Sequence, residues 1–123
     1  MIMCDGGAGT KIAIVAHAAA GLMYYAGRPE QAYKDFMAAL YCAGEDIEPE
    51  LRAALRPVCT ERRPLADWNP ALLHYYAGKS AVLSGSYAMG IKLLQTAAAE
   101  NPYDPAAPLG IAAAYQAWTG DDD

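Results

Sequence analysis

The feature that most constrains the fold is a pair of amphipathic stretches joined by a very short turn, Gly27–Arg28–Pro29. Apolar residues recur at helical spacing in 11–26 and again in 29–43. A glycine at the end of one helix and a proline in the first turn of the next are typical of such a junction. Because the turn is so short, the two helices must lie antiparallel. The sequence therefore predicts a helical hairpin that ends near Gly44.

The rest of the chain shows the same kind of organisation. Asn69 followed by Pro70 marks a helix start, Gly85 interrupts the next helical pattern, and NPYDP breaks the chain before a last helical stretch. We expect Thr10 to cap the first helix. The predicted order is a flexible lead-in (1–10), a first hairpin (11–44), an insertion with an extra helix at about 49–58 (45–69), a second hairpin (70–102), a final helix (103–119) and an acidic tail (121–123).

Composition supports helices throughout. The chain has 123 residues, a length that suits one domain, here 11–120. Alanine is abundant and valine occurs only at Val15, Val58 and Val82, a balance that favours helix over strand. The sequence therefore predicts an all-α fold, an array of antiparallel helix pairs with about six helices.

The word YYAG occurs once in each predicted hairpin. Aligning the two words puts the predicted helices out of register. Aligning the turns instead, Gly27 on Gly85, matches small residues with small ones and large apolar residues with large ones, as when Phe36 meets Leu94. The repeating unit is therefore the hairpin and not the word.

This pattern resembles the tetratricopeptide repeat, a helix–turn–helix of about 34 residues with small and aromatic residues at set positions. GLMYYAGRPEQAYKDFMAAL is similar to one unit and HYYAGKSAVLSGSYAMGIKLLQTAAAENP to another, while PLGIAAAYQAWTGD is similar to an opening helix cut short after its turn. The matching residues are Gly27, Ala32, Phe36, Ala39 and Leu40 in the first unit, and Gly78, Gly85, Tyr87, Gly90, Ala97 and Pro102 in the second. The insertion 45–69 departs from the repeat, so the expected array has one irregular joint. A plain helical bundle is the alternative fold.

The resemblance implies a concave groove, lined by the first helix of each pair, that holds a peptide segment of a partner protein. The residues that the helical phase places on that side are Ile14, His17, Gly21, Tyr24, Tyr25, Leu72, Tyr75, Tyr76, Lys79 and Leu83. Tyrosine suits such a site because it joins a large rigid ring to a polar tip. The alternative is that one tyrosine of each pair is half-buried between helices.

The stretch NPYDPAAPLGIAAAYQAWTG is similar to the corresponding region of class II type III secretion chaperones. Those are small, acidic, cytosolic tetratricopeptide proteins that hold translocator segments in a tyrosine-lined groove. The resemblance implies an adaptor or chaperone that acts in the cytoplasm on a protein or peptide partner.

A different function is suggested by the final helix. Leu109, Tyr115 and Trp118 have no following helix to cover them, and the end of a repeat array needs a polar cap. The alternative function is therefore a structural subunit that self-associates, as a homodimer, through this surface.

Charge and targeting features argue against other classes of partner. The formal net charge is −5, whereas nucleic-acid binding is driven by basic residues. The basic cluster Arg52, Arg56, Arg62 and Arg63 lies among acidic residues and is typical of a solvated face. The start MIMCDGGAGT lacks the features of a signal peptide, and the apolar stretch 12–23 is too short to span a membrane. We expect a cytoplasmic protein with reduced cysteines, no membrane and no nucleic-acid partner.

Nothing in the sequence indicates catalysis, a cofactor or a metal. His17 has no acidic residue at helical spacing, and His74 lies among apolar and aromatic neighbours, so both are expected to be structural. Cys4, Cys42 and Cys59 lack metal-ligand spacing. The expectation is a protein that is not an enzyme, and an enzyme of unrecognised type is a third alternative.

Overall fold

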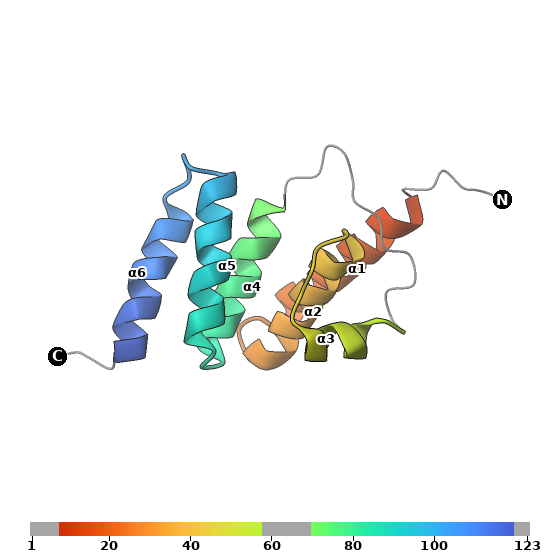
Figure 1. Ribbon diagram of the computed structural model, residues 1–123, viewed down its shortest axis with the longest axis horizontal. Helices are drawn as coiled ribbons and strands as arrows, with labels where there is room; N and C mark the ends of the chain where they lie inside the picture. The colour runs from red at the N-terminus through yellow and green to blue at the C-terminus, as the bar shows by residue number, and fades with distance from the viewer. Residues whose placement is uncertain (1–7, 58–69, 120–123) are drawn as a thin grey trace.

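The structure, a computed structural model, describes residues 8–57 and 70–119 of the chain. Within these residues the chain forms six α-helices and no strands, so the predicted all-α class is confirmed. The helices are α1 (Ala8–Tyr24), α2 (Pro29–Cys42), α3 (Pro49–Leu55), α4 (Ala71–Leu83), α5 (Tyr87–Glu100) and α6 (Ala106–Thr119) (Figure 1).

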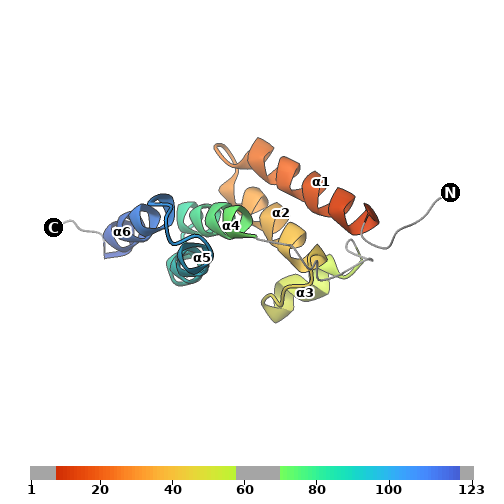
Figure 2. The same cartoon turned by 90° about the horizontal axis from the view of Figure 1, so that it is seen from above.

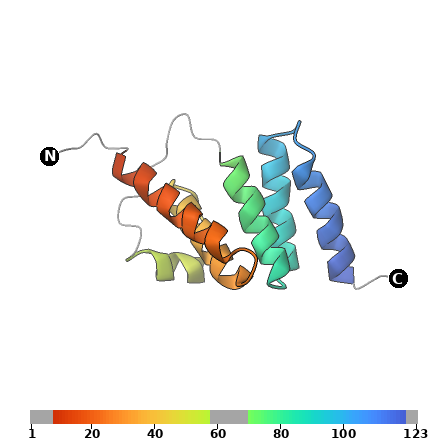
Figure 3. The same cartoon turned by 180° about the vertical axis from the view of Figure 1, so that it is seen from behind.

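The helices pack as sequential pairs along one row. α2 packs against α1 on one side and α4 on the other, and α5 packs against both α4 and α6. Seen from above, α1 and α6 lie at opposite ends of the row, with α3 beside α2 (Figure 2). Seen from behind, α1 lies in front of α2 and α4 in front of α5, so the first helices of the two hairpins face the same way (Figure 3). The stack continues across the insertion because α2 contacts α4 directly.

The start of α1 differs from the prediction. The helix begins at Ala8, so residues 8–10 are not part of a flexible lead-in and Thr10 lies inside the helix instead of capping it. Helix propensity does not explain this extension, because Gly9 and Thr10 are both weak helix formers. The remainder of the predicted lead-in, the second part of the predicted insertion (58–69) and the acidic tail lie outside the described residues.

Two of the predicted turn glycines adopt the conformation that favours glycine, and one does not. Gly44 and Gly85 follow α2 and α4 with φ of 95° and 92°, in the left-handed region. Gly27 is not among the positive-φ glycines, and the turn after α1 instead closes when the Arg28 N–H donates to the Tyr24 carbonyl at 2.7 Å. The first turn therefore does not depend on glycine.

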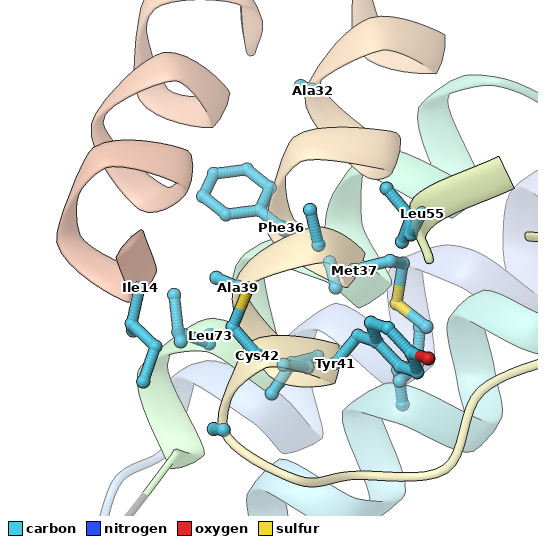
Figure 4. Close-up of a cluster of buried hydrophobic side chains, with 14 residues drawn as sticks. Ile14, Ala32, Phe36, Met37, Ala39, Tyr41, Cys42, Leu55 and Leu73 are labelled. Carbon is cyan, nitrogen blue, oxygen red and sulfur yellow. The ribbon is translucent and has the colours of Figure 1, made fainter. Parts of the chain in front are cut away.

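The hydrophobic core is built around α2, because this helix lies between α1 and α4. Phe36, Leu40 and Cys42 of α2 are fully buried, and Ile14 of α1 and Leu73 of α4 join the same cluster (Figure 4). Burial of large apolar side chains at this position contributes about 1.5–3 kcal/mol each to stability. The core thus joins the two hairpins into one unit.

Small residues stand where helices cross. A Cβ on Gly21 of α1 would lie 2.7 Å from the ring of Phe36, so only glycine allows this ring to pack between α1 and α2. A Cβ on Gly78 of α4 would lie 2.9 Å from the carbonyl oxygen of Gly90 in α5. These contacts give the predicted small residues a definite physical role.

Both ends of the row expose apolar side chains. On α1 they are Ile12, Val15, Leu22 and Met23, and on α6 they are Leu109, Tyr115 and Trp118. In the part of the chain that the structure describes, none of the helices combines the length and the apolar character needed to cross a membrane. The exposed side chains therefore mark the two ends as candidate surfaces for contact with other molecules.

Candidate functional site

Three tyrosines from the two hairpins meet on the side that α1 and α4 share, and we call Tyr25, Tyr75 and Tyr76 the tyrosine cluster. The rings of Tyr25 and Tyr76 pack edge to face with centroids 5.6 Å apart, and those of Tyr75 and Tyr76 do so at 5.4 Å. Such pairs contribute about 0.5–1.5 kcal/mol beyond their buried area. The cluster links Tyr25, in the turn directly after α1, to the middle of α4.

The three tyrosines of the cluster make different contacts. Tyr76 stacks on the core ring of Phe36, with centroids 5.6 Å apart and planes 17° from parallel. Tyr75 turns the other way, and the ammonium of Lys79 lies 5.7 Å from the centre of its ring, a cation–π contact. Burial raises the pKa of the Tyr25 hydroxyl, and this effect outweighs the opposing effect of Lys79, so Tyr25 is a neutral donor at neutral pH. The rings pack together and are half-exposed, as the packing alternative expects, and the peptide-binding groove stays a prediction.

A small pocket opens beside Tyr75 where α4, α5 and α6 come together. Its volume is about 140 Å³, and its lining includes Leu72, Tyr75, Asn101, Asp104 and Ala107. Pockets for cofactors and drug-sized ligands usually measure about 300–1,000 Å³, so this one suits a single apolar side chain. Tyr75 is thus a wall of the pocket and a member of the tyrosine cluster at once.

The other residues predicted for the groove lie in varied places. The guanidinium of Arg28 lies over the Tyr24 ring, 5.6 Å from the ring centre. Leu83 is exposed at the end of α4. His17 is half-buried on α1. Ile14 and Gly21 are buried against α2 and cannot line an open groove, because they form the contact that holds the first hairpin together. The structure brings together Tyr25, Tyr75, Tyr76 and Lys79.

The residues predicted for self-association are all exposed on α6, but only Tyr115 and Trp118, three residues apart, lie on the same side of the helix, and Leu109 lies on another side. Leu109 is 68 % exposed, Tyr115 47 % and Trp118 50 %. The indole of Trp118 stacks between Tyr87 of α5 and Tyr115, with ring centroids 6.2 Å and 6.3 Å apart. This aromatic stack is held in place by its own contacts and remains accessible to a partner.

The sequence analysis missed a polar cluster around His74, which we call the His74 triad. His74 of α4 is only 3 % exposed, yet both of its ring nitrogens have carboxylate partners. Nε2 lies 2.8 Å from Oε1 of Glu45, in the segment after α2, and Nδ1 lies 2.6 Å from Oε1 of Glu100, at the end of α5. Ligand atoms of the three residues lie within 4.8 Å of one another, so this is a group that could hold a metal ion.

The electrostatics of the triad favour a positive charge at its centre. Burial lowers the pKa of His74, but the hydrogen bonds and charges of Glu45 and Glu100 outweigh this effect, so the pKa is raised above its ordinary value of 6.5. Two carboxylates around one imidazole leave the group with a net negative charge even when the ring is protonated.

An open pocket of about 390 Å³ lies against the triad. Its polar lining comprises Glu45, Asp46, Glu48, His74, Lys92 and Thr96, and Met37, Ile47, Met89 and Leu93 line the rest. Glu100 is not part of the lining, so the pocket reaches the Glu45 side of the imidazole while Glu100 holds the other side. Glu48 also accepts a hydrogen bond from the hydroxyl of Tyr33 on α2.

No family model, no curated protein and no solved structure matches this chain. The features of the described residues that could carry a function are the tyrosine cluster, the exposed aromatic stack on α6 and the His74 triad.

Proposed function

We propose that the chain is a tetratricopeptide-like adaptor or chaperone that binds an extended peptide segment of a partner protein across α1 and α4. The observation that carries the proposal is the meeting of the tyrosine cluster with a side-chain-sized pocket at Tyr75. The sequence resemblance to repeat proteins supports the same surface. The further resemblance to class II type III secretion chaperones makes a translocator-like segment one candidate partner.

The chemistry of the surface suits a peptide better than a small molecule. Half-exposed tyrosine rings offer flat apolar area, and their hydroxyls can bond to the carbonyl and amide groups of an extended backbone. The pocket of about 140 Å³ beside Tyr75 would accept one apolar side chain of the peptide. Lys79 at the edge of the cluster adds a cation that favours a carboxylate in the partner.

The test compares Tyr75→Ala with Tyr103→Ala. Tyr103 is 94 % exposed in the turn before α6 and lies outside the cluster, so it is a matched tyrosine control. Affinity capture from native lysate identifies partners, and overlapping synthetic peptides of each captured protein then locate the bound segment by fluorescence anisotropy. We expect Tyr75→Ala to weaken peptide binding at least about tenfold, a hot-spot loss, while helicity by circular dichroism is retained. Equal peptide affinity for both variants would refute the proposal.

The second candidate function is self-association through α6, favoured by the exposed stack of Tyr115 and Trp118. In this reading the chain is a structural subunit, and the tyrosine cluster contributes packing between the hairpins. The two candidates make different demands on solution state, because peptide binding requires no dimer.

A further inference from the structure

We propose that the His74 triad is a binding site for a divalent transition-metal cation, held by Nε2 of His74 and the carboxylate of Glu45, with Glu100 as the positioning residue. The inference is independent of the peptide-binding proposal, since the triad lies on the pocket that α5 and the segment after α2 share. Nothing in the sequence pattern indicates it, because the three residues come from three separate elements.

The two proposed ligand atoms, one on His74 and one on Glu45, lie close to each other. Nε2 of His74 and Oε1 of Glu45 are 2.8 Å apart. Nitrogen and carboxylate ligands lie about 2.0–2.2 Å from a bound zinc ion, so two such ligands at this separation subtend close to a right angle at the metal. That is the angle between neighbouring ligands in a five- or six-coordinate site. Oε1 of Glu45 now occupies the hydrogen-bonding direction of Nε2, so the carboxylate has to swing aside for a cation to bind between them, and this side chain is partly exposed and lines the open pocket.

The second step is the role of Glu100. A histidine that binds a metal usually donates its other ring N–H to a carboxylate, which sets the tautomer and the ring orientation. Nδ1 of His74 lies 2.6 Å from Oε1 of Glu100, as this arrangement requires. The nitrogen left for the metal is Nε2, and this is the nitrogen on the Glu45 side, where the pocket lies.

The third step concerns access and charge. The pocket beside Glu45 and His74 has a volume of about 390 Å³, which leaves room for a cation with its remaining water ligands. Asp46 and Glu48 also line it, and Lys92 is the cation in the lining. The local charge is thus negative before any ion enters, and a divalent cation would offset it.

The donor set narrows the class of metal. Imidazole suits zinc, copper, iron and nickel, whereas a set made only of carboxylate and water would suit magnesium or calcium. One buried imidazole combined with carboxylate oxygen therefore points to Zn²⁺, Cu²⁺, Ni²⁺ or Fe²⁺ more than to Mg²⁺. Zn²⁺ and its spectroscopic substitute Co²⁺ are the appropriate probes.

The test uses the full chain, freed of metal with a chelating resin and then titrated with ZnCl₂, CoCl₂ or MgCl₂. We expect a saturable rise in melting temperature with Zn²⁺ and Co²⁺ but not with Mg²⁺, and a visible d–d spectrum on Co²⁺ addition. Glu45→Gln should weaken Co²⁺ binding at least about tenfold, and Glu100→Gln by about 10–100-fold. His17→Gln is the control, because His17 is the second histidine of the chain and lies on α1, outside the triad.

The test does not need a variant of the buried His74. It uses variants of Glu45 and Glu100, which lie at the partly exposed rim of the triad. Absence of a Zn²⁺-dependent shift in the wild-type protein would overturn the proposal. So would a Co²⁺ spectrum with a thiolate charge-transfer band, which would assign the ion to a cysteine. An unchanged affinity of Glu45→Gln for Co²⁺ would also overturn the proposal. Each of these results leaves the peptide-binding test unaffected.

Discussion

Gly78 and Gly90 face each other where α4 crosses α5, so close that neither position has room for a Cβ. A Cβ on Gly78 would lie 2.9 Å from the Gly90 carbonyl oxygen, and one on Gly90 would lie 2.8 Å from the Gly78 carbonyl oxygen. Backbone atoms cannot move aside as a flexible side chain can. The second hairpin therefore holds its spacing through a pair of glycines.

We predict that Gly78→Ala and Gly90→Ala each lower the free energy of unfolding by about 1–3 kcal/mol, because the added methyl overpacks the crossing. The control is Gly27→Ala, where a Cβ would meet nothing within 4 Å and φ is not positive. Gly27→Ala should be neutral or stabilising, since alanine has fewer unfolded conformations to lose. Urea denaturation measures all three, and equal effects of Gly27→Ala and Gly90→Ala would contradict the prediction.

At Ser80, in contrast to Gly78 and Gly90, substitution by alanine is predicted not to lower stability. Its side chain on α4 is fully buried, and within the described residues its Oγ has no hydrogen-bond partner. A buried hydroxyl without a partner costs about 1–3 kcal/mol, so Ser80→Ala should leave stability unchanged or raise it by about 1 kcal/mol. Ser84→Ala is the matched control, because the Ser84 hydroxyl donates to the Ser80 carbonyl at 3.0 Å and its loss should destabilise. A clear loss of stability in Ser80→Ala would indicate a partner for the hydroxyl.

Tyr33 is predicted to make stability depend on alkaline pH. Burial and the hydrogen bond to the Glu48 carboxylate raise the pKa of Tyr33 above its ordinary value of 10.0. Because the folded pKa is the higher one, the stabilisation is complete below the unfolded pKa and is lost as pH rises through the folded pKa. Tyr33→Phe should be less stable than the wild type by about 1 kcal/mol at neutral pH.

The measurement is the urea midpoint from about pH 8 to about pH 11, a range that brackets the ordinary pKa of tyrosine. Stability of the wild type should fall more steeply than that of Tyr33→Phe above the ordinary tyrosine pKa. Tyr103→Phe is the control, since Tyr103 is 94 % exposed and should not change the slope. Parallel curves for the wild type and Tyr33→Phe would count against the role of this hydrogen bond.

Self-association through α6 is tested by Trp118→Glu. If the stack of Trp118 on Tyr115 and Tyr87 lies in a dimer interface, a buried carboxylate there should shift the molecular mass from dimer to monomer. The mass is measured by light scattering after size-exclusion chromatography over a range of concentrations. Gln116→Glu is the matched control, because Gln116 is an exposed polar residue of the same helix. A wild-type protein that stays monomeric at the highest concentration would remove the self-association function.

Local sequence signals were sufficient for the existence of the helices and for some of their bounds. α5 (Tyr87–Glu100) lies between the two predicted breaks, because Gly85 and Asn101–Pro102 act on the backbone directly around them, whereas α6 begins at Ala106 and not at 103. The predicted start of the first helix is wrong, because Thr10 lies within α1 and does not cap it. The register of small residues at Gly78 and Gly90 followed from the repeat pattern, but the pattern did not show that two backbones touch there.

The candidate sites depended on tertiary structure to different degrees. Helical phase placed Tyr25, Tyr75 and Tyr76 on the first helices, but only packing decided that Tyr76 stacks on Phe36 while Tyr75 faces Lys79. The His74 triad was out of reach of any local pattern, because Glu45 and Glu100 lie far from His74 in the chain. Glu45 meets His74 when α2 packs on α4, and Glu100 meets it when α5 packs on α4.

The amino-acid sequence by itself determined the helices, their pairing and the small residues at their crossings, because periodicity, glycine and proline act within a few residues of the chain. The tertiary structure alone decided which polar groups share a buried site. Such a site is formed by distances between separate helices, and those distances follow from how side chains such as Phe36 fill the space between them.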